Sequence, residues 1–350
     1  MKLALNDVEF AVKERLHAFG AKSRLSRYGG VTVWPQDARM GITWLPFSNV
    51  LLEIGRPRML AILTRRVVRC LLLAVAVSAC VVVAAESGGA AAPIRFGVTP
   101  AIVHDQYGVL DDWRTYLERK LQRKVEFVSR DSYRETIDLI SQRKLDFAWV
   151  STVPYVYLDR RKYARLLLTP TYRGRPYYCA YFIVPATDQQ TTSLLDLEGK
   201  VFAYADAYSN TGHLVPRSFL RQAGRDPNKF FRKTFFTWSH RKVIVAVTKG
   251  LADGGSIDSF VWDTLSVIDP ELTNQTRIVS KSEEFGFPPI VVSASVGKQD
   301  TAAMRTVLLA MAKDPDGVAL LKRLNIDGFI PGDTRLYDKV VRLQRAFGNQ

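Results

Sequence analysis

Three polar segments of this 350-residue chain carry side chains suited to binding an oxyanion. The first, 206–216, reads DAYSNTGHLVP and comes directly after a predicted strand. Ser209, Asn210 and Thr211 are favourable N-cap residues, and Gly212 would let a ligand approach the backbone closely. A helix that begins here would present free N–H groups, a partial positive charge and side-chain donors together. The segment therefore predicts an oxyanion site, although a plain capped helix explains the same residues.

The other two segments also follow predicted strands. Ser151 and Thr152 supply hydroxyls at a second helix start, with Pro154 close to the first turn that proline favours. His240 follows a third strand and could donate to an anion, and the adjacent Arg241 could raise the local potential. Taken singly, each feature is more typical of an ordinary cap or a structural histidine. Two such helix starts in different halves of the chain favour a binding site.

An alternation of strands and helices must position these segments. Strands are expected at 94–98, 124–129, 145–150, 179–184, 200–205, 232–237 and 290–294, and helices at 111–121, 133–142, 302–312 and 336–347. Repeated strand–helix–strand units of this length predict an α/β fold with parallel sheets and helices on both faces. In such sheets ligands bind beyond the carboxyl ends of the strands, which is where the three polar segments fall.

The titratable residues do not indicate catalysis. Asp253 and Asp258 could be catalytic or metal-binding carboxylates, but their glycine-rich setting beside a strand suggests structural roles, with ligand contact by Asp258 left open. Beyond residue 93 the one cysteine is Cys179, and the histidines lack metal-ligand spacing. Gly254-Gly255 lacks the Gly-Lys-Ser/Thr of a phosphate loop. We therefore expect no catalytic residue, no metal and no cofactor.

Charge and composition limit the partners. The hydrophobic share of 47% excludes wholesale disorder, and three cysteines cannot form a disulfide framework in a chain of this length. The net charge is +15, but residues 94–350 carry 37 Lys/Arg and 28 Asp/Glu, and their longest basic run is Arg160-Arg161-Lys162. Dispersed positive charge favours an acidic environment or anionic ligands and opposes a nucleic-acid groove.

The segment 59–85 has the pattern of a secretory signal peptide: arginines, then a short apolar core, then small residues. Its sixteen uncharged residues are fewer than the roughly 20 that span a bilayer. We expect cleavage before Glu86, with lipidation at Cys80, a retained anchor or a buried helix as alternatives. Met59 starts the signal, so residues 1–58 are interpreted as an N-terminal extension from a misassigned start codon.

Together these segments resemble the phosphate/phosphite/phosphonate-binding proteins of ABC importers. The resemblance covers about 94–345 and rests on a set of motifs in the family's order: Ser209 to Pro216, Ser239-His240, Gly250 to Asp253, Asp258-Ser259 and Pro288 to Val291. It implies a type II periplasmic-binding-protein fold, in which two α/β lobes are joined by two crossing segments and close on a ligand cleft. One lobe would hold 94–182 with 289–350, and the other 183–288.

The same resemblance implies the binding residues. The helix start at Ser209, Asn210 and Thr211 would grip the anionic oxygens, and His240 would complete that grip. The remaining implied ligand-binding residues are Tyr133, Tyr178, Ser151 and Thr152 on the facing lobe, with Asp258 left open. The ligand would be a small phosphorus oxyanion and the partner an ABC permease, with no nucleic acid and a monomeric chain.

Two other functions remain open at this point. The same fold could be a ligand-binding sensor that partners a membrane histidine kinase. It could also be an enzyme, which would need a reactive histidine or cysteine cluster that the sequence does not contain.

The resemblance also bears on specificity. Relatives that favour aminoalkylphosphonates hold the ammonium with acidic side chains, and the best-matching positions here are Phe260 and Pro288. Burying an unpaired ammonium costs several kcal/mol, so we expect phosphite, phosphate or methylphosphonate instead. Glu283 and Glu284 are close enough in sequence that a loop could bring one of them inward.

Overall fold

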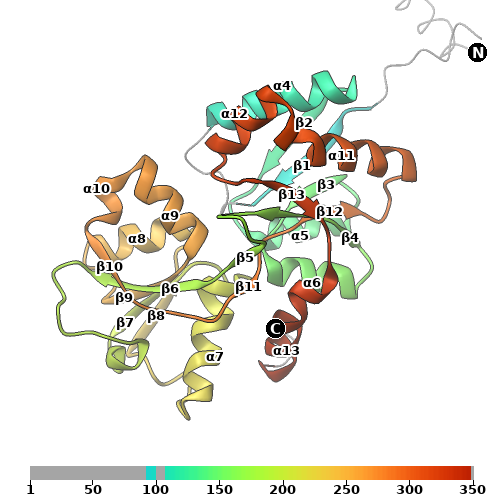
Figure 1. Cartoon of the computed structure of the whole chain (residues 1–350). Helices are drawn as coiled ribbons and strands as arrows, with labels where there is room; N and C mark the ends of the chain where they lie inside the picture. Colours follow the sequence, from blue (N-terminus) through green and yellow to red (C-terminus); the bar gives the residue numbers. More distant parts are fainter. Residues whose placement is uncertain (1–91, 100–106, 348–350) are drawn as a thin grey trace, which may run out of the picture. The chain divides into compact units, whose positions relative to one another are not determined.

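The computed structural model describes residues 92–99 and 107–347. The expectations for the extension 1–58, the signal peptide 59–85 and Cys80 lie outside these residues. The described residues form an α/β structure with two mixed sheets and a short two-stranded connection (Figure 1). None of the described helices is long and apolar enough to cross a membrane.

The first sheet has six strands in the order β13-β4-β12-β3-β1-β2. These are β1 (Ile94–Val98), β2 (Val125–Ser129), β3 (Phe147–Trp149), β4 (Ala164–Thr171), β12 (Ile290–Ser293) and β13 (Gly328–Pro331). Figure 1 shows α4 (Tyr107–Leu121), α11 (Lys298–Ala310) and α12 (Pro315–Arg323) over one face, with α5 (Tyr133–Ser141) and α6 (Thr152–Arg160) over the other. An aromatic core lies beneath α4, where the Trp113 ring is 5.4 Å from Phe96 and 6.1 Å from Trp149.

The second sheet has five strands in the order β10-β6-β9-β7-β8. These are β6 (Ala180–Pro185), β7 (Val201–Tyr204), β8 (Lys233–Phe236), β9 (Gly254–Asp258) and β10 (Thr276–Lys281). The helices α8 (His240–Thr248), α9 (Ser259–Ile268) and α10 (Pro270–Thr273) lie on one side, and α7 (Val215–Gln222) lies on the other. Short helical turns η1 (Leu194–Leu197), η2 (Asn210–Leu214), η3 (Met311–Lys313) and η4 (Thr334–Tyr337) and the last helix α13 (Asp338–Phe347) complete the described elements.

The chain passes twice between the two sheets, and the two crossings pair with each other. The strands β5 (Tyr177–Tyr178) and β11 (Phe285–Gly286) form an antiparallel pair. Because β6 begins at Ala180 and pairs with β9, the chain changes sheet a few residues before the boundary at 182 that we expected. We call the part around the six-stranded sheet lobe 1 and the part around the five-stranded sheet lobe 2.

The expectation of parallel sheets was wrong, whereas the α/β class was right. In lobe 1, β12 runs antiparallel to both β3 and β4, and in lobe 2, β6 runs antiparallel to β9. In addition, β13 runs antiparallel to β4, and β10 runs antiparallel to β6. The crossings explain the directions of β6 and β12, because β6 directly follows one crossing and β12 directly follows the other. Successive strands of a sheet run parallel when a crossover helix connects them. A strand that enters the sheet from the neighbouring lobe is not preceded by such a helix, so it can run antiparallel.

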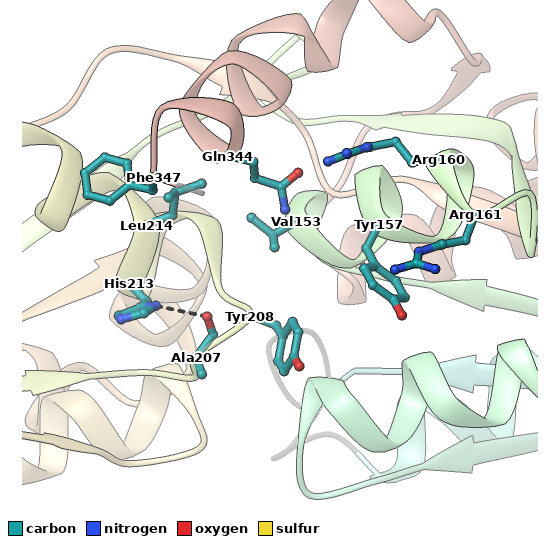
Figure 2. A pocket seen from close by; sticks show the side chains of 10 residues that line it. All are labelled: Val153, Tyr157, Arg160, Arg161, Ala207, Tyr208, His213, Leu214, Gln344 and Phe347. Atoms are coloured by element: carbon teal, nitrogen blue, oxygen red, sulfur yellow. Dashed lines mark hydrogen bonds between the residues drawn. The ribbon is translucent and has the colours of Figure 1, made fainter. Parts of the chain in front are cut away.

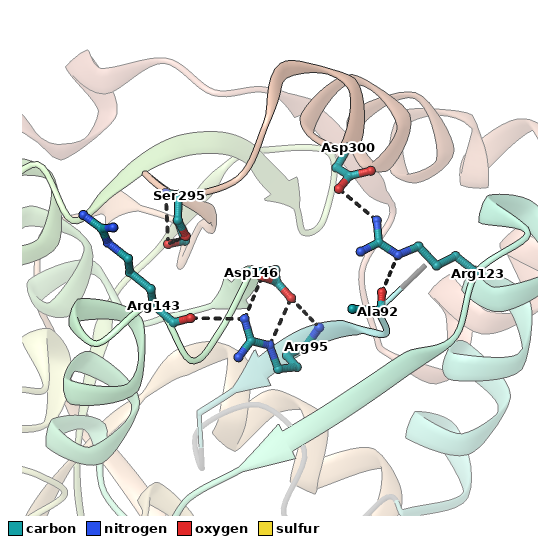
Figure 3. Close-up of polar contacts among 8 residues, drawn as sticks. Ala92, Arg95, Arg123, Arg143, Asp146, Ser295 and Asp300 are labelled. Atoms are coloured by element: carbon teal, nitrogen blue, oxygen red, sulfur yellow. Dashed lines mark hydrogen bonds and ion pairs between the residues drawn. The ribbon is translucent and has the colours of Figure 1, made fainter. Parts of the chain in front are cut away.

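A polar cluster secures the amino-terminal edge of the first sheet (Figure 3). Asp146, just before β3, accepts from the Arg95 backbone N–H and pairs with the Arg95 guanidinium at 3.0 Å. Arg123 donates to the Ala92 carbonyl and to Asp300 at 2.8 Å. The polar segments identified in the sequence follow the opposite ends of the strands, so this cluster joins elements rather than serving the site.

Candidate oxyanion-binding site

The segment after β7 forms a wide helical turn whose first residues are buried. The Leu214 amide donates to the Ser209 carbonyl five residues earlier, and the Ser209 hydroxyl caps the turn by accepting from the Gly212 amide at 3.0 Å. Such wide turns are rare in proteins, and those that occur are often found at functional sites. The amides of Asn210 and Thr211 lie in the first turn, where no carbonyl of the same helix can reach them. The helix start predicted from the sequence is present, with unused donors.

Gly212 has a different role from the one expected. A Cβ built there would lie 2.5 Å from the Ala205 side chain and 2.9 Å from His240 Cε1. The missing side chain therefore gives space to the histidine, rather than to a ligand approaching the backbone. This packing brings His240, the first residue of α8, against the turn.

The bonding of His240 fixes which ring nitrogen carries the proton. Its Nδ1 accepts from the Asp258 backbone N–H at 3.1 Å, so the proton of the neutral ring is on Nε2. Burial lowers the pKa of His240 to about 3, and the ring is neutral at physiological pH. Nε2 lies 3.3 Å from Ser209 Oγ, so the ring presents a neutral N–H donor beside the turn.

Lobe 1 and the crossing supply further hydroxyls to the same place. The Tyr178 hydroxyl is 2.9 Å from Thr152 Oγ1 and accepts from Asn210 Nδ2 at 3.2 Å. Asn210 Oδ1 is buried and has no hydrogen-bond partner among the described residues, so this amide could still accept one hydrogen bond, for example from a P–OH group. Ser151 precedes α6, but its hydroxyl does not cap that helix. The plain-cap interpretation of this segment is therefore not what the geometry favours.

We call six residues the donor cluster: Thr152, Tyr178, Ser209, Asn210, Thr211 and His240. Each is at most 3% exposed, and none carries a positive charge. Burial holds the pKa of Tyr178 well above its ordinary value, so its phenol stays protonated and able to donate. The cluster joins both lobes through neutral donors.

Tyr133 lies at the adjoining edge, as the first residue of α5. Its backbone N–H donates across the lobes to Asp206 Oδ2 at 3.1 Å, and the other Asp206 oxygen accepts from the Tyr208 amide at 2.7 Å. Burial is the largest effect that raises the pKa of the Tyr133 phenol, and the negative charges of Asp206 and Asp258 raise it further. Asp206 was missed in the sequence, although it directly follows a predicted strand, as the other site residues do.

Asp258 is buried at the end of β9 and caps α9. Its Oδ1 accepts from the Phe260 amide at 2.8 Å, and burial raises the pKa of the carboxyl to about 7. Its backbone N–H also holds His240, as described above. These contacts give Asp258 a positioning role, and contact with a ligand stays a prediction.

An aromatic wall bounds the donor cluster beyond Tyr178. The Phe287 ring is 5.9 Å from the Tyr178 ring and 5.1 Å from Phe260, which lies 5.3 Å from Tyr172. The two nearby glutamates are held elsewhere: Glu284 pairs with Arg175 at 2.7 Å and Glu283 with Lys339 at 2.7 Å. The wall is therefore apolar. Phe287 was not identified from the sequence as part of the site.

Four helical elements begin at this site, which defines what it can do chemically. Tyr133, Thr152 and His240 are the first residues of α5, α6 and α8, and Asn210 is the first residue of η2. Helix starts carry partial positive charge and unused N–H groups. Among the described residues no group of three or more His, Cys, Asp or Glu could hold a metal. The arrangement suits binding of a dehydrated anion.

Comparison with solved structures shows that this two-lobed α/β structure has the type II fold of periplasmic binding proteins. A binding protein component of an ABC phosphonate transporter from Pseudomonas aeruginosa matches with a TM-score of 0.67 and 20% identity, over 72% of this chain and 85% of that one. PhnD1 from Prochlorococcus marinus, solved with methylphosphonate, matches with a TM-score of 0.66 and 21% identity, over 73% and 97%.

The chain belongs to the family of periplasmic substrate-binding proteins of phosphonate ABC transporters, whose model matches residues 96–337. The probable phosphite-binding protein PhnD1 of the same Prochlorococcus marinus strain is 20% identical over 239 residues, which is 65% of this chain and 80% of the relative. Members of this family bind and deliver a ligand and are not enzymes. The resemblance seen in the sequence is confirmed, and the enzyme alternative is wrong.

Proposed function

We propose that this protein captures a small phosphorus oxyanion, namely phosphite, phosphate or an alkylphosphonate, between its two lobes in the periplasm. One observation carries the proposal: the starts of α5, α6, α8 and η2 meet at a buried cluster of neutral donors. A tetrahedral oxyanion needs several donors that point inward from more than one side. Hydrogen bonds to a charged acceptor are about twice as strong as neutral ones, which offsets the lost hydration.

The donors are divided between the lobes, which supports capture by closure. Ser209, Asn210, Thr211 and His240 come from lobe 2, whereas Thr152 and Tyr133 come from lobe 1. A ligand that bonds to both sides stabilises the closed form more than the open form. We assign Ser151 to the same wall of lobe 1, next to Thr152.

The aromatic wall supports a preference for ligands without an amine. Phe260 and Phe287 offer an ammonium group neither a negative charge nor a hydrogen-bond acceptor, and Glu284 and Glu283 are paired with Arg175 and Lys339. A methyl group or a hydrogen on phosphorus carries no charge, so placing it against this wall does not remove water from a charged group. Asp258 is a buried carboxylate beside His240, and its Oδ1 accepts from the Phe260 and Val261 amides at the start of α9.

Delivery to the permease of an ABC importer is the second part of the proposal. Family membership and the pattern at 59–85 support export to the periplasm, with a mature chain beginning near Glu86 or, if Cys80 is lipidated, at that cysteine. We propose that the protein acts as a monomer. Its lobe 1, expected from the sequence at 94–182 with 289–350, contains the described residues 94–99, 107–176 and 290–347. A closed, ligand-bound monomer is the form that a permease would recognise.

A panel of ligands tests the proposal. We expect phosphite, phosphate or methylphosphonate to raise the melting temperature, and 2-aminoethylphosphonate to raise it less at equal concentration. Titration calorimetry then ranks the three anions. A clear preference for the amine would show that a carboxylate reaches the ligand, and absence of binding by all four would overturn the function.

A further inference from the structure

A separate pocket of about 250 Å³ lies beside the donor cluster (Figure 2). Three elements build it: α6 and α13 from lobe 1, and the segment 207–214 from lobe 2. Tyr157 of α6 and Tyr208 of that segment extend into the same space. None of the donor-cluster residues lines the pocket, although Val153 and Tyr208 are chain neighbours of Thr152 and Ser209.

The pocket is positively charged. Arg160 and Arg161 line it, and they belong to the longest basic run seen beyond the signal segment. Among the described residues that line it there is no carboxylate. The Arg161 guanidinium lies 5.6 Å from the centre of the Tyr157 ring, where stacking holds it near the pocket. Two adjacent guanidinium groups would attract and orient a carboxylate or phosphate group.

The rest of the lining is apolar or has unused polar capacity. Val153, Leu214 and Phe347 supply aliphatic and aromatic surface, and the two tyrosine rings add flat faces. Gln344 Oε1, a buried acceptor, has no hydrogen-bond partner among the described residues, so it could accept from a donor on the apolar body but would not hold the anionic group. The Tyr208 hydroxyl accepts from Arg134 at 2.9 Å, so its ring is held in place. Such a lining suits a flat apolar body that carries one anionic group.

Both lobes contribute to the pocket, so its occupancy depends on how they meet. The helix α13 of lobe 1 contacts α7 of lobe 2, where Arg221 donates to the Ala346 carbonyl at 2.8 Å and lies 5.1 Å from the Phe347 ring. A molecule bound between α6, α13 and the 207–214 segment favours this arrangement of the lobes. By linkage, it would strengthen binding at the donor cluster, and the reverse would also hold.

We infer that this pocket is a second binding site, for an organic anion with a flat apolar body, and that its occupancy is coupled to that of the donor cluster. The inference goes beyond the proposed function, because it concerns a different ligand and different residues.

The test uses 2-naphthoate as the anionic probe and 2-naphthamide as a neutral probe of the same shape. Both are titrated by fluorescence into the full chain, with and without saturating methylphosphonate. We expect 2-naphthoate to bind at least tenfold more tightly than 2-naphthamide. Methylphosphonate should tighten 2-naphthoate binding severalfold. Binding of 2-naphthoate without methylphosphonate tests the pocket even if methylphosphonate itself does not bind.

The variant Arg160→Gln/Arg161→Gln should weaken 2-naphthoate binding at least tenfold and leave 2-naphthamide binding unchanged. Its matched control, Lys298→Gln/Arg305→Gln, removes the same charge from exposed positions of α11 in the same lobe and should change neither. Three results would each overturn the inference: equal binding of the two probes, equal effects of the two double variants, or displacement of 2-naphthoate by methylphosphonate.

Discussion

The Ser209 hydroxyl oxygen is used as an acceptor within the turn, and we propose that its hydrogen is left for a ligand. Its oxygen accepts from the Gly212 amide at 3.0 Å and faces His240 Nε2 at 3.3 Å. Thr211 follows two residues later on the same turn, and its carbonyl accepts from the Ser256 hydroxyl at 2.6 Å, which fixes the backbone there. These bonds hold the backbone of the turn, so we expect little adjustment when a donor is lost.

Replacing Ser209 and Thr211 by alanine should weaken binding of methylphosphonate and phosphite. Each lost bond to a charged ligand costs about 1.5–3 kcal/mol, which is roughly 10- to 100-fold in affinity. Calorimetry on the single and double variants measures this. Asp253→Ala is the control, because Asp253 accepts from the Val201 amide at the far end of β7 and should affect stability alone. An unchanged affinity in the double variant would contradict the assignment.

His240 makes a prediction about stability and pH. Its pKa in the folded chain is about 3, below the ordinary 6.5, so below pH 6.5 the unfolded chain binds a proton that the folded chain excludes. Stability is therefore lost as the pH falls from 6.5 towards 3. His213, with a pKa of about 4, acts in the same direction, and Asp258, raised to about 7, opposes both.

The variant His240→Gln keeps a neutral donor but removes this titration. Urea unfolding between pH 7 and pH 4.5 should show that the free energy of unfolding falls less with pH in the variant. The difference in slope should correspond to about one proton fewer taken up on unfolding. His213 still titrates in the variant, so some loss remains. Equal slopes in the two proteins would mean that His240 is not buried as a neutral ring.

Among the secondary-structure elements, the loop after β7 and the start of α5 are joined across the lobes by Asp206. Its carboxylate accepts from the Tyr133 amide in one lobe and the Tyr208 amide in the other. Arg134, which follows Tyr133, also donates to the Tyr208 hydroxyl at 2.9 Å. These contacts require the lobes to meet, so they stabilise the closed form.

Asp206→Asn should therefore release methylphosphonate faster, with an affinity loss of about threefold to tenfold, because a charged acceptor is replaced by a neutral one. Stopped-flow measurements separate the dissociation rate from the association rate. Asp146→Asn is the matched control at the opposite edge of the first sheet (Figure 3), and it should lower stability without changing dissociation. Faster release in both variants would show a general loss of structure instead.

The same elements show which parts of the fold could be predicted from sequence. The strand β1 matches its predicted bounds because its buried apolar pattern is local. The strand β9 was missed because Gly254 and Gly255 have low strand propensity, yet Cβ atoms there would lie 2.5 Å from Leu197 and 2.4 Å from Val243. Strand direction at β6 and β12 depends on the crossings, which no local pattern encodes. The polar helix starts were predictable, whereas Asp206 and Phe287 matter through partners distant in the chain.

At the scale of the whole molecule, export should remove the amino-terminal segment. The arginines before residue 70, the short apolar core and the small residues that end it predict cleavage before Glu86. Intact mass and N-terminal sequencing of the exported protein decide between that site and a lipidated Cys80. Finding residues 1–58 on the mature protein would contradict the interpretation of a misassigned start.

Ligand capture should also change the relation of the lobes. The crossings β5 and β11 pair at Tyr178–Phe285 and Tyr177–Gly286, and they connect the two sheets where a hinge is needed. Because the donor cluster is buried when the lobes meet, the free protein must open there to admit an anion. Small-angle scattering should therefore show a smaller radius of gyration after methylphosphonate is added. The Ser209→Ala/Thr211→Ala variant should not contract at the same ligand concentration. Scattering that stays constant while calorimetry records tight binding would mean that the lobes are closed before the ligand arrives, and that the anion enters by another route.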